Sequence, residues 1–143
     1  MVTSTGHAVC YSSSVPPYDL KERTRLFALA VVNFCRRLPR TDEAREAAKQ
    51  LRRAANSVRS NYRASKNGRS RDEFASRLAE AYEEADECRD CLQYLCDADI
   101  QSDPELLEEA RALTRILAAS LKTTRINSAR MKAIRQQEKA SRK

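Results

Sequence analysis

Five cysteines and one histidine are the residues of this chain best suited to metal or redox chemistry. Cys88-x-x-Cys91 has the spacing of two zinc ligands, and His7-x-x-Cys10 could supply the other two. The same Cys-x-x-Cys spacing occurs in thiol redox enzymes, but there it accompanies a βαβ pattern. Cys88 instead continues a regular apolar heptad, where a free thiol behaves as a small buried hydrophobe. We therefore expect inert thiols, without a metal site or a cofactor.

Other catalytic chemistries find little support in the composition. The two glycines, Gly6 and Gly68, lie too far apart to form a Gly-rich loop that cradles phosphates. The single histidine, His7, lies in a polar leader, which removes most arrangements of a nucleophile with a histidine base. Metal-assisted hydrolysis would need a cluster of convergent carboxylates, and none is recognisable. The chain is expected not to be an enzyme.

Charge is strongly segregated along the chain, whose net charge is +7. Residues 1–71 carry 15 Lys and Arg against 5 Asp and Glu, and residues 110–143 carry 10 against 1. The segment between them, residues 72–109, carries 2 Lys and Arg against 14 Asp and Glu. Two basic blocks that flank one acidic block indicate that charge has a role in binding or assembly.

The first basic block contains a stripe of cations on one predicted helix. At about 100° per residue, the stripe falls within one arc beside the apolar face of that helix. Evenly spaced cations of this kind meet phosphate groups without discriminating between sequences, so the pattern favours a surface that binds a nucleic-acid backbone. We call this set the helix-two stripe, and it consists of Arg45, Lys49, Arg52, Arg59, Arg63 and Lys66.

The helix-two stripe has a second interpretation. Glu73, Glu80, Glu84 and Glu87 fall on one flank of the next predicted helix. Opposed flanking charges are how adjacent helices, within one subunit or between subunits, select their partners. The stripe could therefore hold helices together instead of binding a ligand, and the chain would then be a structural oligomer or an adaptor for other proteins.

The C-terminal basic block has few carboxylates nearby, because Glu138 is the one acidic residue after residue 110. A tail of this composition is better explained by binding to a polyanion than by a contribution to solubility alone. Two further arginines of the first block are Arg53, on the solvent side of its helix, and Arg69. The candidate nucleic-acid contacts are therefore the helix-two stripe together with Arg53, Arg69, Arg130, Lys132 and Arg135.

Four amphipathic helices would position these residues. Residues 1–18 are rich in Ser, Thr, Val and Pro and are expected to form a loose leader. From residue 19, apolar positions recur every three or four residues up to Pro39, which ends the first helix. A second helix begins at Thr41 or Asp42 and ends at Asn67-Gly68.

Capping signals open the third and fourth helices. Ser70 with Glu73, and Ser102 with Glu105, have the capping-box spacing, and Pro104 suits a first helical turn. The apolar pattern of the fourth helix thins after about Thr124, and residues 126–143 form a basic tail that either continues as helix or frays. Together these elements predict an all-α fold, an antiparallel up-down-up-down four-helix bundle over residues 19–125.

The segment from Gln50 to Phe74 resembles a known protein family. It contains Gln-Leu-Arg-Arg-Ala-Ala-Asn-Ser-Val at residues 50–58, then Asn61, Asn-Gly-Arg-Ser at residues 67–70, and Glu73 before Phe74. This pattern resembles the bacterial four helix bundle protein family, also called the intervening-sequence protein family, because some members are encoded inside insertions in large-subunit ribosomal RNA genes. In architecture, the chain is similar to the accessory variability proteins of diversity-generating retroelements.

This resemblance carries expectations about assembly and partners. It implies a non-enzymatic bundle, often a homopentamer, that binds RNA or DNA. In the retroelement proteins a positive surface serves RNA and a reverse transcriptase, so a reverse transcriptase is a candidate partner. The odd number of cysteines and the lack of a secretory signal or of an apolar stretch long enough to span a bilayer favour the cytoplasm over a membrane.

Overall fold

The computed structural model describes residues 19–142 of the chain. Residues 1–18 and residue 143 lie outside the described part. The expected leader, and the pair His7 and Cys10 considered above as zinc ligands, therefore fall outside it.

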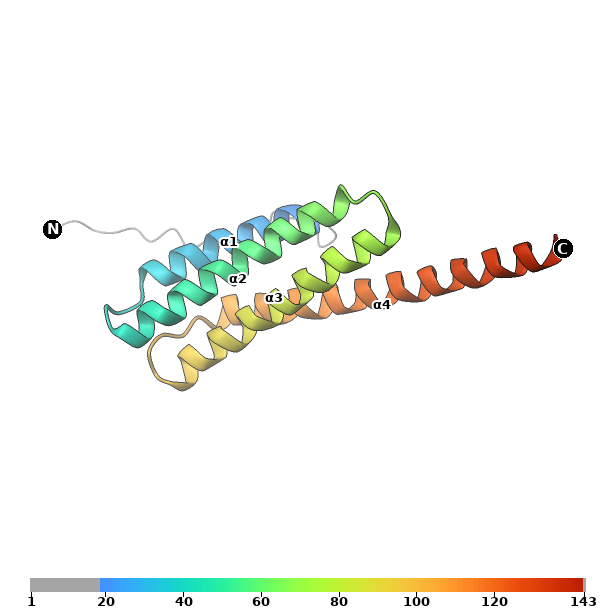
Figure 1. Ribbon diagram of the computed structural model, residues 1–143. Helices are drawn as coiled ribbons and strands as arrows, with labels where there is room; N and C mark the ends of the chain where they lie inside the picture. Colours follow the sequence, from blue (N-terminus) through green and yellow to red (C-terminus); the bar gives the residue numbers. More distant parts are fainter. Residues whose placement is uncertain (1–18, 143) are drawn as a thin grey trace.

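Four α-helices form the described part of the chain, which confirms the expectation of an all-α four-helix bundle. They are α1 (Leu20–Arg36), α2 (Asp42–Lys66), α3 (Arg71–Asp97) and α4 (Pro104–Ser141). Figure 1 shows the chain reversing direction at each connection, so that every helix runs back along the one before it. α2 packs against α1 and α3, and α4 packs against α3 and, over a shorter length, against α1.

Each helix begins at a side-chain cap that accepts a hydrogen bond from an otherwise unpaired backbone N–H. At the start of α3, the Ser70 hydroxyl accepts from the Glu73 N–H, and the Glu73 carboxylate accepts from the Arg69 N–H. Ser70 and Glu73 therefore pair as the capping-box spacing predicted, except that the carboxylate accepts from the N–H of Arg69, one residue before the cap. At α4, the Asp103 carboxylate accepts from the Leu106 N–H, so the cap is Asp103, directly before Pro104, and the predicted capping box of Ser102 with Glu105 was wrong by one residue. Asp19 and Thr41 cap α1 and α2 in the same way.

The core lies along the bundle axis and combines large side chains with many alanines. Phe27 and Phe34 of α1, Leu78 of α3 and Leu113 and Leu117 of α4 are completely buried. α2 contributes mainly small residues, since its buried positions include Ala44, Ala47, Ala48, Ala54 and Ala55. Small side chains let α2 approach its neighbours closely, which brings the charged flanks of adjacent helices within reach of one another.

One half-buried ion pair joins the first helix to the last. The Arg23 guanidinium donates to both carboxylate oxygens of Glu109, at 2.7 and 2.9 Å. The two side chains are only 22% and 11% exposed. Hydrogen bonding to Glu109 raises the pKa of Arg23 above its ordinary value. The pair fixes α1 against α4, which are the two neighbouring helices with the least direct packing.

α4 continues as helix to Ser141, and its 38 residues span about 57 Å at 1.5 Å per residue. The part beyond Leu121 carries no buried residue among those described, and Figure 1 shows it projecting past the other helices. The sequence left open whether the basic tail continues as helix or frays, and in the structure it continues as helix. No helix within residues 19–142 is long and apolar enough to cross a membrane.

Candidate nucleic-acid interface

A basic groove lies between the end of α1, the α1–α2 connection and the first half of α2. Its open volume is about 370 Å³. Leu38, Pro39, Ala44 and Ala48 provide small or apolar walls, and the Cys35 thiol lies among them. Five cations line it: Arg36, Arg40, Arg45, Lys49 and Arg52. We call this feature the α1–α2 groove.

The cations of the α1–α2 groove are exposed and lack carboxylate partners on other helices. Arg45 pairs with Asp42, one turn earlier on α2. No salt bridge within residues 19–142 engages Arg36, Arg40, Lys49 or Arg52. Because five cations converge here and Asp42 is the one carboxylate paired with them among the described residues, the groove has a positive potential and suits an anionic ligand.

Arg52 also affects the chemistry of the groove wall. Burial raises the pKa of the Cys35 thiol, and the Arg52 guanidinium beside it opposes that rise. The Cys35 Sγ lies 3.8 Å from the Ala48 carbonyl oxygen and donates to it. Since burial is the larger effect, Cys35 remains a protonated thiol and contributes packing to the groove.

The remaining members of the helix-two stripe continue along α2 beyond the groove. The Arg59 guanidinium donates to the Asn56 side-chain oxygen at 2.7 Å, which holds it along the helix surface. Arg63 is exposed, and the Lys66 ammonium lies over the rings of Tyr62 and Phe74 at 5.4 and 5.7 Å from their centroids. None of these three cations pairs with an α3 glutamate in the described part of the chain.

Arg53 is the α2 residue that pairs with carboxylates of α3. Its guanidinium donates to Glu84 at 3.2 Å and to both carboxylate oxygens of Glu87 at 2.8 and 2.9 Å. These hydrogen bonds raise the pKa of Arg53. The prediction that placed Arg53 on the solvent side was incomplete: the side chain is 56% exposed, yet it is held by α3. Arg53 is therefore a structural residue and not a free cation for a ligand.

The other predicted contacts lie at the far end of the bundle. Arg69 is exposed in the α2–α3 connection. On α4, Lys132 lies 3.6 Å from Asp72, with both side chains well exposed, and Arg135 is exposed one turn later. Arg130 lies on the opposite side of α4 from Arg135 and Lys132. At 100° per residue, the rotation around the helix axis that separates it from them is about 140° and 160°, respectively. The structure thus separates Arg130 from the other predicted contacts on this helix.

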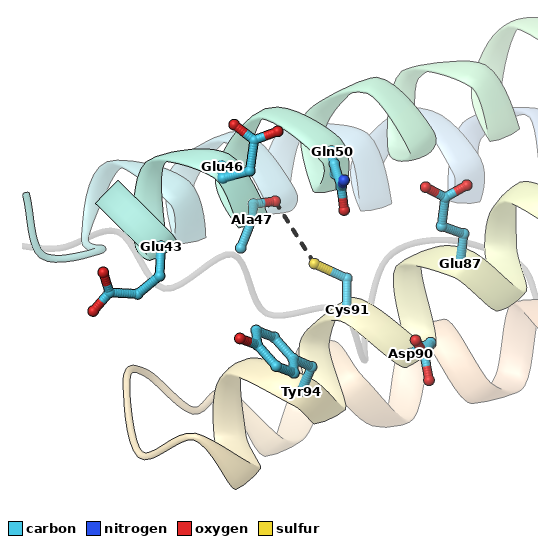
Figure 2. Close-up of a pocket in the computed structure, with 8 residues that line it drawn as sticks. All are labelled: Glu43, Glu46, Ala47, Gln50, Glu87, Asp90, Cys91 and Tyr94. Carbon is cyan, nitrogen blue, oxygen red and sulfur yellow. Dashed lines mark hydrogen bonds between the residues drawn. The ribbon is translucent and has the colours of Figure 1, made fainter. Parts of the chain in front are cut away.

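An acidic groove runs along the other flank of α2, against α3. It has an open volume of about 410 Å³, and its carboxylates are Glu43, Glu46, Glu87 and Asp90. Figure 2 shows these side chains around the opening, with Tyr94 at one end and Cys91 on the floor donating to the Ala47 carbonyl oxygen at 3.6 Å. The first half of α2 therefore separates a basic groove from an acidic one.

The thiols do not gather into a ligand set. Cys88 is fully buried, which raises its pKa strongly, and burial raises the pKa of Cys91 to about 11. Cys96 is exposed on the far side of the same helix. Within residues 19–142, no group of three or more His, Cys, Asp or Glu side chains is placed to hold a metal ion.

Two cations of the groove were not among the predicted contacts. Arg36 and Arg40 bracket the turn that ends α1, and that turn aims them at the same space as Arg45 and Lys49. A signal was present in the sequence, since Arg36-Arg37-Leu38-Pro39-Arg40 places three arginines around a helix-ending proline. The acidic groove was also missed, because it requires two helices whose relative rotation the sequence does not specify.

Comparisons with known proteins point to one family. The model of a family described as "23S rRNA-intervening sequence protein" matches residues 18–122. A crystal structure of a protein of unknown function from the S23 ribosomal protein family of Bacteroides thetaiotaomicron has a similar fold, with a TM-score of 0.67 and 23% sequence identity. The similarity covers 72% of this chain and 98% of that one. No curated protein matches the chain.

Proposed function

The chain belongs to the 23S rRNA-intervening sequence protein family, and on this basis we propose that it is a non-enzymatic, self-associating bundle that binds the phosphate backbone of nucleic acid. The observation that carries the proposal is the α1–α2 groove, where five exposed cations from α1, α2 and their connection converge without a carboxylate from a third helix. Phosphate groups are the counter-charges that such a surface fits best.

The proposed ligand is a backbone and not a base sequence. The groove walls are alanine, proline and leucine side chains, and no aromatic ring lines the groove. The groove lining lacks the amide and carboxylate side chains that read adenine and cytosine edges, and its cations are of the residue types that most often contact phosphate. The family name makes structured RNA the first ligand to test, with DNA as the second. A reverse transcriptase is the protein partner suggested by the resemblance to retroelement accessory proteins, and the cytoplasm is the proposed compartment.

Self-association is supported by what the bundle leaves uncovered. The core is rich in alanine, and Leu29 of α1 and Tyr94 of α3 remain 47% and 54% exposed. Apolar side chains of this size on two helices suit contacts with further copies of the chain. Five copies in a ring are the leading expectation, taken from the resemblance. Light scattering that gives the mass of a monomer, 16.2 kDa, at tens of micromolar protein would reject self-association.

The acidic groove favours a second candidate function, that of a structural oligomer or adaptor. The basic groove of one copy could dock on the acidic groove of the next, because the two lie on opposite flanks of α2 and carry opposite charge. Such a contact is heterologous, and repeating it generates a ring or a filament. In that case the α1–α2 groove is covered by protein and does not meet nucleic acid.

One set of variants separates the two functions. The groove variant is Arg45→Gln, Lys49→Gln and Arg52→Gln, and its matched control is Lys21→Gln, Arg71→Gln and Lys122→Gln, which removes the same charge from exposed sites elsewhere. Fluorescence anisotropy with a structured RNA measures affinity, and light scattering measures mass. Nucleic-acid binding predicts that the groove variant loses affinity about 200-fold at 0.1 M salt, far more than the control, at unchanged mass.

The adaptor function predicts a different result for the same variants. The groove variant would then fall to a smaller assembly, as would a variant of the acidic groove, Glu43→Gln with Glu46→Gln. Equal RNA affinity for the groove variant and its control, at unchanged mass, would contradict the nucleic-acid proposal.

A further inference from the structure

The face of α4 that is apolar inside the bundle becomes cationic beyond it. Leu113, Leu117 and Leu121 lie on that face and are buried. Past Leu121 the same face, within an arc of about 100°, carries a row of cations at intervals of seven, three, four and three residues. We call this row the α4 seam, and it consists of Arg125, Lys132, Arg135, Lys139 and Arg142.

The seam is almost free of counter-charges. Its one ion pair in the described part of the chain joins Lys132 to Asp72 at 3.6 Å, between side chains that are 64% and 71% exposed. Ser128, beside the seam, donates to the same carboxylate at 3.3 Å. These contacts place the seam at the end of the bundle where α3 begins, and the residues beyond Lys132 project without cover (Figure 1).

Solubility alone does not account for this pattern. A projecting helix is best supported by opposite charges three or four residues apart, whereas Arg135 and Lys139 are like charges at i and i+4. Lys132 with Arg135, and Lys139 with Arg142, are like charges at i and i+3. Each such pair weakens an isolated helix, and Glu138, three residues after Arg135 and four before Arg142, is the one carboxylate of the extension that offsets part of this repulsion. A polyanion that lies along the seam would remove that repulsion.

The shape and composition of α4 favour a duplex as that polyanion. α4 contains no Phe, Tyr or Trp, so it has no ring on which unpaired bases can stack, and stacking is the main attraction by which proteins hold single strands. The seam is a rigid rod about 25 Å long, from Arg125 to Arg142. A duplex presents phosphates at fixed spacing along such a length, whereas a single strand must lose conformational freedom to do so.

We propose that the α4 seam is a second nucleic-acid contact, and that it binds the phosphate backbone of a duplex in preference to a single strand. This inference rests on the proposed function, since it assigns a ligand class to a protein proposed to bind nucleic acid. The seam lies beyond residue 122, where the match to the family model ends. The preference for a duplex therefore belongs to this chain's extension and not to the shared bundle.

The test uses the full chain with a 20-base-pair RNA duplex, a 20-base-pair DNA duplex and unstructured oligo-uridine of equal length. The seam variant is Arg135→Gln with Lys139→Gln. Its matched control, Lys21→Gln with Lys122→Gln, removes the same charge from exposed sites outside the seam and outside the α1–α2 groove. Glutamine is a good helix former, and circular dichroism confirms that α4 remains helical in both.

At 0.1 M salt, two lost phosphate contacts are worth about 60-fold on a duplex. We expect the seam variant to lose at least about tenfold in duplex affinity and less than about threefold on oligo-uridine, with the control below about threefold on both. A similar preference for RNA and DNA duplexes would show backbone recognition, and a preference for one would identify the helical form that fits.

Two outcomes would overturn the inference while leaving the proposed function in place. One is wild-type protein that binds oligo-uridine as tightly as either duplex. The other is seam and control variants that lose duplex affinity equally while the α1–α2 groove variant still loses more. Absence of binding to all three ligands by the wild-type protein would instead reject the proposed function itself.

Discussion

Arg52 and Arg53 are adjacent on α2 and lie in opposite surroundings. Arg52 lines the α1–α2 groove and makes no salt bridge in the described part of the chain, whereas Arg53 holds Glu84 and Glu87 of α3. The same substitution at each position, Arg52→Gln or Arg53→Gln, should therefore have different consequences. The first should weaken nucleic-acid binding, and the second should lower the free energy of unfolding.

The size of each effect follows from the contacts. Arg53 makes three hydrogen bonds to two carboxylates, and one oxygen of Glu84 is already buried without a partner. Exposed pairs contribute about 0.2–1 kcal/mol each, so losing both costs about 1 kcal/mol. For a chain of this size, that lowers Tm by about 4 °C. Arg52 supplies one phosphate contact, worth about sixfold in affinity at 0.1 M salt.

The assay pairs urea denaturation, followed by circular dichroism, with anisotropy measured on the same two proteins. We expect Arg53→Gln to lower unfolding free energy and to bind RNA within about twofold of wild type, and Arg52→Gln to show the reverse. If Arg52→Gln destabilised the fold as much as Arg53→Gln, the groove cations would be structural. If both variants lost affinity equally, net charge alone would explain binding, and the reasoning from geometry would be refuted.

Three further predictions concern the fold. Glu109→Gln should cost about 2 kcal/mol in unfolding free energy, because it leaves the half-buried Arg23 without its charged partner, whereas Glu108→Gln, on the exposed surface, should change the unfolding free energy little. Cys88→Ala should cost about 1–2 kcal/mol through the cavity it leaves and should not change RNA affinity. The free energy of unfolding should fall as pH rises from about 9 to about 11. The reason is that burial raises the pKa of the Cys91 thiol in the folded chain, so the unfolded chain loses the thiol proton at a lower pH. The fall should be smaller in Cys91→Ala.

The sequence was sufficient to predict the bundle, because its signals are local. Ser70 with Glu73 opens α3 as a capping box, and Cys88 lies in the core where the apolar heptad placed it. Such signals act within one helix and need no knowledge of its neighbours. The course of α4 beyond Leu121 was harder to predict, since no buried face supports a helix there and only local preferences for helix remain.

The candidate site was predicted less completely, because it depends on how helices are placed around one another. Helical periodicity put the helix-two stripe on one flank of α2 and Arg53 away from the core, but it cannot say which neighbouring helix lies on which flank. The structure places α3 within reach of Arg53 and the end of α1 beside Arg52. Arg36 and Arg40 enter the site through a turn, whose direction no periodic pattern encodes.

The salt dependence of nucleic-acid binding by the wild-type chain tests the central claim most directly. Anisotropy titrations with several unrelated RNA sequences between 50 and 300 mM salt give the slope of log affinity against log salt concentration. The account predicts a slope of about −3 or steeper, from the groove cations alone, and the same slope for every sequence. No binding at 50 mM salt, or an affinity that salt does not change, would contradict it.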